Sequence, residues 1–263
     1  MENILREIVE SRKKSVAHGF KYLKECEIGN SKNRRKSLSE SINDNSGISI
    51  ISEIKPASPT LGEIKEISNV SDIAREMENA GVVGLSVLTE PDYFNGSYEN
   101  LRLAVEATAL PCLMKDFVID EVQFEIAAKI GATNILLITA LGNLEKFLEF
   151  SLQYDLEPLI EVHMAEEIEE LERLVEIGMA PKLIGVNNRN LNTMKIDLIN
   201  SKNLIPLLKE NFGNNLVVIS ESGIKSYEDI RYLLSSKADA FLVGSSIMKS
   251  NNIKNTIRYL RGL

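Results

Sequence analysis

Eight short apolar stretches alternate with longer amphipathic segments from about residue 47 onward. Apolar runs of this kind are typical of buried strands, and the segments between them carry the spacing of helices. The predicted strands are 49–55, 84–88, 112–115, 134–138, 158–162, 182–187, 216–220 and 239–243. Eight such units predict an α/β fold, a closed (β/α)8 TIM barrel. An open doubly wound sheet is the alternative, although no glycine-rich dinucleotide fingerprint follows the first predicted strand.

The chain length of 263 residues suits one domain, because barrels of this class commonly contain about 250 residues. We assign 1–263 to a single TIM-barrel domain, in which 47–263 form the barrel. Residues 1–46 form a helical N-terminal extension around the basic segment SKNRRKS. This extension either packs against the barrel or closes one end of it as a lid, and the sequence leaves both open.

The chain carries 30 Lys and Arg against 38 Asp and Glu, a formal net charge of −8. That balance argues against nucleic acid or an anionic membrane as a partner. No apolar run reaches the roughly 18 residues of a membrane span, and the N-terminus lacks the apolar core of a signal peptide. Two cysteines, Cys26 and Cys112, are too few for a disulfide framework, so we expect a cytoplasmic protein.

Charged residues close four of the apolar stretches. Glu53 and Lys55 end the first, Lys115 the third, Glu161 the fifth and Glu221 the seventh. An ionised side chain in a buried strand is strongly destabilising unless another group pairs with it or the reaction uses it. Barrel enzymes carry their catalytic residues at the carboxyl ends of the strands. The pattern therefore predicts an active site at that end.

Strand periodicity places Glu53 and Lys55 on one face, which a barrel turns toward its lumen. The two residues form either a structural pair that neutralises itself or part of an acid–base site. Lys115 is a candidate general acid or Schiff-base nucleophile, unless it simply extends to solvent. Glu161 is an acid–base candidate, whereas we expect His163, one step further out, to hydrogen-bond a loop.

Further polar residues follow the third and sixth predicted strands. Asn187 offers a donor and an acceptor, and Arg189 could hold a carboxylate in a bidentate grip. Turn chemistry is the alternative explanation for both, because Asn favours tight turns. Asp116 follows Lys115 directly and should point the other way, so we expect a structural role for it.

The last two strands each end in a glycine beside a serine: Ser222 and Gly223, then Gly244 and Ser245. The glycines allow close approach of a ligand to the backbone, and barrels often bind phosphate between their last two loops. Ser58, after the first strand, could add a hydroxyl. This arrangement predicts a phosphate site.

The residues alone imply metal-free acid–base chemistry on a phosphorylated small molecule. The histidines and cysteines form no clustered metal site, although a carboxylate-bound Mg²⁺ stays open. No catalytic triad and no P-loop is evident. Isomerisation, aldol cleavage and ring closure all remain possible at this point.

Seven motifs together resemble the indole-3-glycerol phosphate synthase family of tryptophan biosynthesis. They are EIKPASP (53–59), SVLTEPDYFNGS (86–97), LMKDFVID (113–120), LIEVH (159–163), GVNNRNL (185–191), SESGI (220–224) and VGSSIM (243–248). The resemblance implies ring closure, decarboxylation and dehydration of 1-(2-carboxyphenylamino)-1-deoxyribulose 5-phosphate. It implies no cofactor, because the nitrogen of the substrate becomes an iminium that accepts the electrons of the departing carboxylate.

The resemblance also implies roles for individual residues. Lys115 would protonate the ketone oxygen, Glu161 would transfer protons during dehydration, and Lys55 and Glu53 would support them. The implied substrate contacts are Asn187, Glu221 and Ser222 for hydroxyls and the amine, Arg189 for carboxylates, and Phe94 and Phe117 for the aromatic ring. The implied phosphate contacts are Ser58, Gly223, Gly244 and Ser245. The extension would cover the barrel mouth and exclude water.

Asn190, Met114 and Pro56 depart from the commonest family pattern, but none replaces a proposed proton-transfer residue. The resemblance implies a monomer or weak homo-oligomer that could associate with other tryptophan-pathway enzymes. Two alternatives remain: another phosphate-binding barrel, such as a sugar-phosphate isomerase or Schiff-base aldolase, and a catalytically dead barrel that serves as a binding partner.

Overall fold

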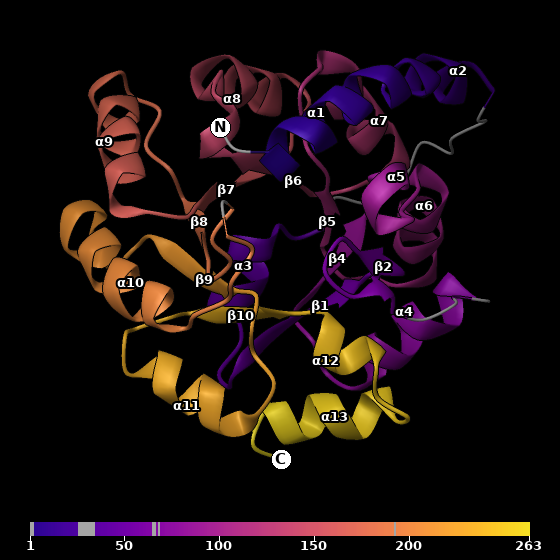
Figure 1. Ribbon diagram of the computed structural model, residues 1–263. Coiled ribbons are helices and arrows are strands. Elements are labelled where there is room, and N and C mark those ends of the chain that lie inside the picture. The colour runs from indigo at the N-terminus through magenta and orange to yellow at the C-terminus, as the bar shows by residue number, and fades with distance from the viewer. Residues whose placement is uncertain (1–2, 26–34, 65–66, 68, 192) are drawn as a thin grey trace.

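Eight parallel strands close into a barrel in the order β1-β10-β9-β8-β7-β6-β5-β4 (Figure 1). This computed structural model describes residues 3–25, 35–64, 67, 69–191 and 193–263. The barrel strands are β1 Ser49–Ile54, β4 Gly84–Leu88, β5 Cys112–Lys115, β6 Asn134–Ile138, β7 Glu157–Val162, β8 Leu183–Asn187, β9 Val217–Glu221 and β10 Ala240–Val243. All eight predicted strands and the TIM barrel are confirmed, and the open sheet is wrong because β1 pairs with both β10 and β4.

A ring of helices surrounds the barrel (Figure 1). Its members are α4 Val70–Asn79, α6 Tyr98–Ala107, α7 Glu121–Ile130, α8 Leu144–Gln153, α9 Ile168–Glu176, α10 Ile199–Phe212, α11 Tyr227–Leu234 and α13 Ile253–Leu260. Local sequence signals fix several boundaries. Asp120 begins α7 with a capping box that includes Gln123, and Gly131 ends it in the left-handed conformation. No helix of the described residues is long and apolar enough to cross a membrane.

Shorter elements lie in the segments that connect the barrel strands to the helices that follow them. They are β2 Ala57–Ser58, β3 Gly62–Glu63, α5 Pro91–Phe94, η1 Thr139–Leu141, η2 Ala165–Glu167 and α12 Ser245–Met248. Most follow the carboxyl ends of barrel strands, which is where α/β barrels build their sites.

The core has two layers, which explains why the strands are apolar on both faces. One layer packs between the strands and the surrounding helices and includes Phe124, Phe241 and Ile257. The other fills the lumen and includes Leu113, Leu159 and other aliphatic side chains from alternate strand positions. The charged strand ends lie above this lumenal layer.

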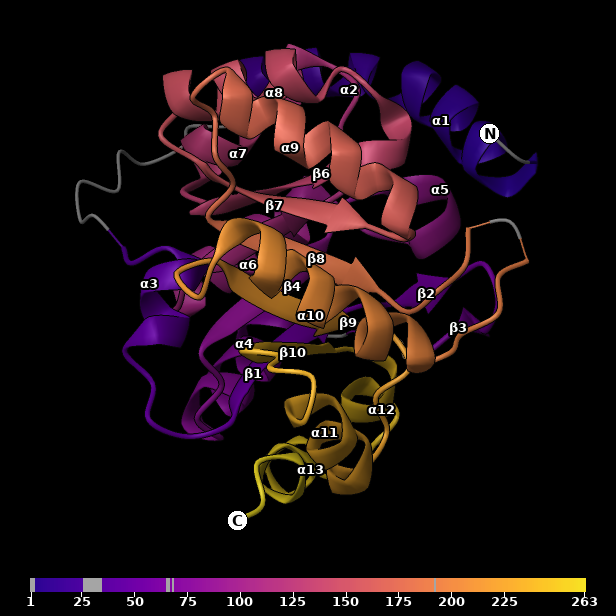
Figure 2. The same ribbon diagram turned by 90° about the vertical axis from the view of Figure 1, so that its left-hand side faces the viewer.

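The N-terminal extension divides between the two ends of the barrel. Its helices are α1 Asn3–Ser15, α2 Ala17–Glu25 and α3 Leu38–Asn43. Helix α3 plugs the amino ends of the strands, where Leu38 is fully buried in the lumenal layer and its N–H donates to Asn134 Oδ1. Helix α1 lies at the other end, toward which the strand arrows point (Figure 2).

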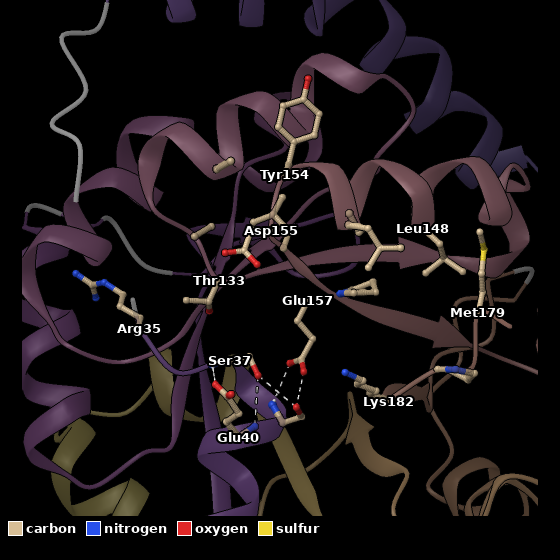
Figure 3. A pocket seen from close by; sticks show the side chains of 18 of the residues that line it. Arg35, Ser37, Glu40, Thr133, Leu148, Tyr154, Asp155, Glu157, Met179 and Lys182 are labelled. Atoms are coloured by element: carbon tan, nitrogen blue, oxygen red, sulfur yellow. Dashed lines mark hydrogen bonds between the residues drawn. The ribbon is translucent and has the colours of Figure 1, made fainter. Parts of the chain in front are cut away.

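A hollow of about 630 Å³ lies beside α3 at the amino end of the strands (Figure 3). The polar side chains at its base serve the fold. Glu157 accepts hydrogen bonds from Asn134 Nδ2 at 2.8 Å and from the backbone N–H of Ser39 at 3.0 Å. These bonds attach α3 to the barrel, at the end remote from the charged strand ends.

Candidate active site

A cavity of about 470 Å³ opens at the carboxyl end of the barrel, and the strand ends supply much of its wall. All fourteen residues predicted from the sequence line it: Glu53, Lys55, Ser58, Phe94, Lys115, Phe117, Glu161, Asn187, Arg189, Glu221, Ser222, Gly223, Gly244 and Ser245. Helix α1 adds the apolar side chains of Ile4, Leu5 and Ile8. The fold thus brings distant segments together in one cavity, while their chemical roles stay predictions.

Lys115 reaches across the lumen to two buried carboxylates. Its Nζ lies 3.1 Å from Glu161 Oε2 and forms a second, close ion pair with Glu221. Burial alone would lower the pKa of Lys115, but the charges of Glu161, Glu221 and Glu53 outweigh it, so the pKa is raised. The lysine is therefore an ammonium at neutral pH, able to donate a proton.

The pKa values of the two carboxylates beside Lys115 are shifted in opposite directions. Burial raises the pKa of Glu221 to about 7, and the nearby charge of Glu161 adds to this effect. Burial acts on Glu161 in the same sense, but Lys115 and His163 outweigh it and hold the pKa of Glu161 below its usual range. A pair of titratable groups with separated pKa values is typical of acid–base sites.

A glycine between these carboxylates creates the space for them. Gly185 on β8 is the register partner of Glu161 on β7, and β9, which carries Glu221, pairs with its other side. A Cβ added at Gly185 would overlap Glu221 Oε1. The missing side chain therefore lets both carboxylates reach Lys115 from neighbouring positions.

Glu53 and Lys55 form an ion pair at the end of β1. Glu53 is 3% exposed, and an added Cβ at Gly244 would overlap its Oε1. The sequence predicted Gly244 only as part of a phosphate site. The structure shows a second reason for glycine here, because a side chain would overlap Glu53.

Another group of cavity residues has small side chains and unusual backbone. Ser222 and Gly223 both have positive φ, of 68° and 86°. Such a conformation is costly for serine and often marks a functional position. The Ser58 hydroxyl is buried and has no hydrogen-bond partner among the described residues. Gly244 and Ser245 stand at the start of α12. Together these features suit a small anion.

Asn187 and Arg189 line the cavity and also form part of a turn. The side-chain Oδ1 of Asn187 accepts a 2.9 Å hydrogen bond from the backbone N–H of Arg189, so the predicted turn chemistry is present. The guanidinium of Arg189 lies 3.5 Å from Thr60 Oγ1 and donates to Met194 O at 3.2 Å. Burial lowers the pKa of Arg189, an effect that Glu53 opposes.

Two phenyl rings flank the apolar side of the cavity. The centroids of Phe94 and Phe117 are 6.0 Å apart with the rings tilted by 39°. Glu90, fully buried, caps α5 by accepting hydrogen bonds from the backbone N–H groups of Asp92, Tyr93 and Phe94. This cap fixes the backbone that carries the Phe94 ring, a role of Glu90 that was not predicted from the sequence.

The sequence matches the family profile of indole-3-glycerol phosphate synthase over residues 5–260. The chain belongs to the indole-3-glycerol phosphate synthase family. A protein of that name from Methanocaldococcus jannaschii is 41% identical over 256 residues, which cover 95% of this chain and 92% of the relative.

Two further relatives carry the same name. The protein from Aquifex aeolicus is 42% identical and covers 82% of each chain, and that from Staphylococcus haemolyticus is 33% identical over 98% of this chain and 97% of its own. A solved structure, thiamine phosphate pyrophosphorylase from Pyrococcus furiosus, matches with a TM-score of 0.60 at 15% identity. It covers 82% of this chain and 94% of its own, and it shows the fold alone.

In this synthase-family chain, Asp116 has the structural role expected of it, but its partner was missed. Arg12 of α1 is 1% exposed and donates from Nε and Nη2 to the two Asp116 oxygens, each at 2.8 Å. Thr89 Oγ1 also donates to Asp116, at 2.6 Å. In the sequence Arg12 belongs to a charged, amphipathic segment, where nothing distinguishes it from solvated neighbours.

The prediction for His163 is wrong for its ring. The ring faces Glu161 instead of a loop, with Nε2 3.2 Å from Oε1. The backbone of His163 bonds to neighbouring helices: its N–H donates to Glu167 of η2, and its carbonyl accepts from Asn200 Nδ2 of α10. Among the described residues, no group of three or more His, Cys, Asp or Glu is arranged to hold a metal ion.

Proposed function

We propose that the chain catalyses the reaction of its family: it converts 1-(2-carboxyphenylamino)-1-deoxyribulose 5-phosphate to indole-3-glycerol phosphate, carbon dioxide and water. The observation that carries this proposal is Lys115, held as an ammonium between Glu161 and Glu221 in a cavity that also presents small residues suited to a phosphate. A proton donor and an anion site in one cavity match a phosphorylated ketone substrate.

The first half of the reaction needs an acid at the ketone. The aryl carbon that bears the carboxylate attacks the ketone carbon, and Lys115 protonates the ketone oxygen as it gains charge. The amine nitrogen donates its lone pair and becomes an iminium. Loss of carbon dioxide returns the electrons of the broken bond to that iminium.

The second half removes water. The hydroxyl made from the ketone leaves as water, and a proton is lost from the neighbouring carbon to form the indole. Glu161, a carboxylate with a lowered pKa, accepts and returns protons in this half. Lys55 and Glu53 support the transfer as a paired acid and base.

The remaining predicted residues orient the substrate. Ser58, Gly223, Gly244 and Ser245 would bind the phosphate, and Asn187, Glu221 and Ser222 would bind hydroxyls and the amine. Arg189 would hold a carboxylate, and Phe94 and Phe117 would flank the aromatic ring. Ile4, Leu5 and Ile8 of α1 would exclude water at the mouth.

The Schiff-base alternative is disfavoured by the charge state of Lys115. A lysine attacks a carbonyl only as the neutral amine, and neighbouring carboxylates raise the pKa of this one. We further propose that the protein acts in the cytoplasm, as a monomer or weak homo-oligomer on a small phosphorylated substrate.

The test is to mix the purified protein with the anthranilate-derived ribulose phosphate and to follow indole fluorescence without added metal. We expect product from the native protein and a strongly reduced rate from Lys115→Met. No product from a protein whose fold is confirmed by circular dichroism would contradict the proposal.

A further inference from the structure

His163 is a buried histidine just beyond β7 that the mechanism above does not use. Its side chain is 2% exposed, and Nε2 lies 3.2 Å from Glu161 Oε1. On the other side, Nδ1 lies 4.0 Å from Glu167 Oε2. Glu167 is fixed at η2, because it accepts hydrogen bonds from the backbone N–H groups of His163 and Met164. Both ring nitrogens therefore face carboxylate oxygens.

This arrangement suits only the charged form of the ring. A neutral imidazole carries one N–H and one lone pair, so either tautomer turns a lone pair toward a carboxylate. An imidazolium presents an N–H at both nitrogens. Neither nitrogen of His163 makes a well-aligned hydrogen bond within the described part of the chain. The contact with Glu161 is therefore mainly an attraction between charges.

The charges in the lumen also favour a further cation beside Glu161. Lys115 faces both Glu161 and Glu221, so one positive charge stands against two buried carboxylates. A buried carboxylate without a compensating charge is strongly destabilising. His163 lies on the side of Glu161 away from Lys115, because it contacts Oε1 whereas Lys115 contacts Oε2.

Four charged groups face this ring or its partner: Glu161 from β7, Glu167 from η2, Glu221 from β9 and, through Glu161, Lys115 from β5. Burial by itself lowers the pKa of His163. The carboxylates outweigh burial, and the pKa of His163 is raised above its usual value.

We propose that His163, as an imidazolium, is a positioning residue that keeps Glu161 ionised and turned toward Lys115. The inference rests on the proposed function, in which Glu161 transfers protons. His163 acts through Glu161 and not on the substrate, because its side chain is not among the described residues that line the cavity.

The ion pair can be measured without any substrate. The chain has two histidines, so ¹⁵N-labelling of histidine gives two ring systems, and His163→Asn identifies the one of interest. We expect its titration midpoint to lie above the ~6.5 of free histidine and to fall in Glu161→Gln. Glu167→Gln, which keeps an acceptor for the two backbone amides, should lower the midpoint less. A midpoint that Glu161→Gln leaves unchanged would overturn the proposal.

Kinetics then separate positioning from mere packing. Without the imidazolium, the Glu161 and Glu221 pair binds a proton more readily. His163→Asn should therefore move the midpoint of the kcat profile nearest neutral pH upward by about one unit, which is tenfold in rate on that limb. KM should change little, because the phosphate side is untouched. A uniform loss of kcat with unchanged midpoints would show a structural role and overturn the proposal.

The activity assay and the histidine titration together also distinguish a failure of this inference from a failure of the function on which it rests. A native protein that makes no product would contradict the proposed function, while the histidine titration would still decide whether the ion pair exists. An active native protein whose His163 ring is neutral at pH 6 would leave the function intact and remove the inference.

Discussion

Arg12 of α1 and Asp116, the residue after Lys115, form a buried ion pair with two parallel 2.8 Å hydrogen bonds. Arg12 also donates to the hydroxyl of Tyr98. The pair joins the N-terminal extension to the strand that carries the proposed general acid. The extension is thus coupled to the geometry of the active site as well as to the wall of its cavity.

Arg12→Met should lower both stability and activity. Removing one partner of a buried ion pair leaves an uncompensated charge and typically costs about 3–5 kcal/mol. We expect a loss of that size in the free energy of unfolding by urea, together with a lower kcat/KM as Lys115 loses its support.

Two variants control this prediction. Lys13→Gln on the same helix breaks only the exposed pair with Glu10 and should leave the unfolding midpoint unchanged. Arg12→Met combined with Asp116→Asn should recover part of the lost stability, because asparagine carries no charge and its side-chain oxygen can still accept the hydrogen bond from Thr89. A single Arg12→Met variant as stable as the native protein would contradict the assignment.

Lys115→Met should lower kcat by at least about 10²-fold, the usual scale for a general acid. Methionine keeps much of the lysine length but cannot donate a proton. The measurement is single-turnover indole formation, and borohydride should trap no substrate on the native protein because the amine is charged. Near-normal turnover in Lys115→Met would remove the assigned role, and covalent trapping would favour an aldolase.

The fold could be predicted because its signals are local. Each strand is a short apolar run, and each boundary differs from the prediction by at most a residue or two. The charged strand ends were equally visible, since Lys115 or Glu161 at the end of an apolar run is an anomaly within a few residues of sequence.

The missed contacts depend on tertiary neighbours far away in the sequence. Arg12 has its role because the fold brings it against Asp116, which is 104 residues away in the sequence. No spacing in the sequence indicates that contact. Gly185 lies in a strand with no unusual sequence pattern. The need for glycine there is visible only in the fold, where Glu221 of the next strand occupies the space that a side chain would fill. His163 followed Glu161 at strand spacing, but the sequence did not show that Glu167 would fold back beside it.

Gly185→Ala should reduce kcat by about 10²-fold, the scale expected when catalytic groups move by about an ångström. The added methyl group would overlap Glu221 and push its carboxylate away from Lys115. Steady-state kinetics check this, with Gly47→Ala as the matched control because nothing lies within 4 Å of an added Cβ there. Equal losses in both variants would show a general effect of alanine and not a specific overlap.

Glu221→Gln should make the protein more stable at neutral pH while it lowers activity. Burial raises the pKa of Glu221 to about 7 in the folded state, above the ~4.3 of an unfolded chain. Between these values the folded state binds more protons than the unfolded state, so the native protein loses stability as pH rises through that interval. Glutamine stays neutral and has no such loss.

The stability difference between Glu221→Gln and the native protein should therefore grow from about pH 4.3 to about pH 7 and stay constant above it. Urea unfolding at half-unit pH steps measures this difference. Glu210→Gln, at an exposed position of α10, is the matched control for replacing one glutamate by glutamine. A difference that shrinks as pH rises would mean that Glu221 is stabilised as a carboxylate, and Glu221 could then not be the member of the pair that holds a proton near neutral pH.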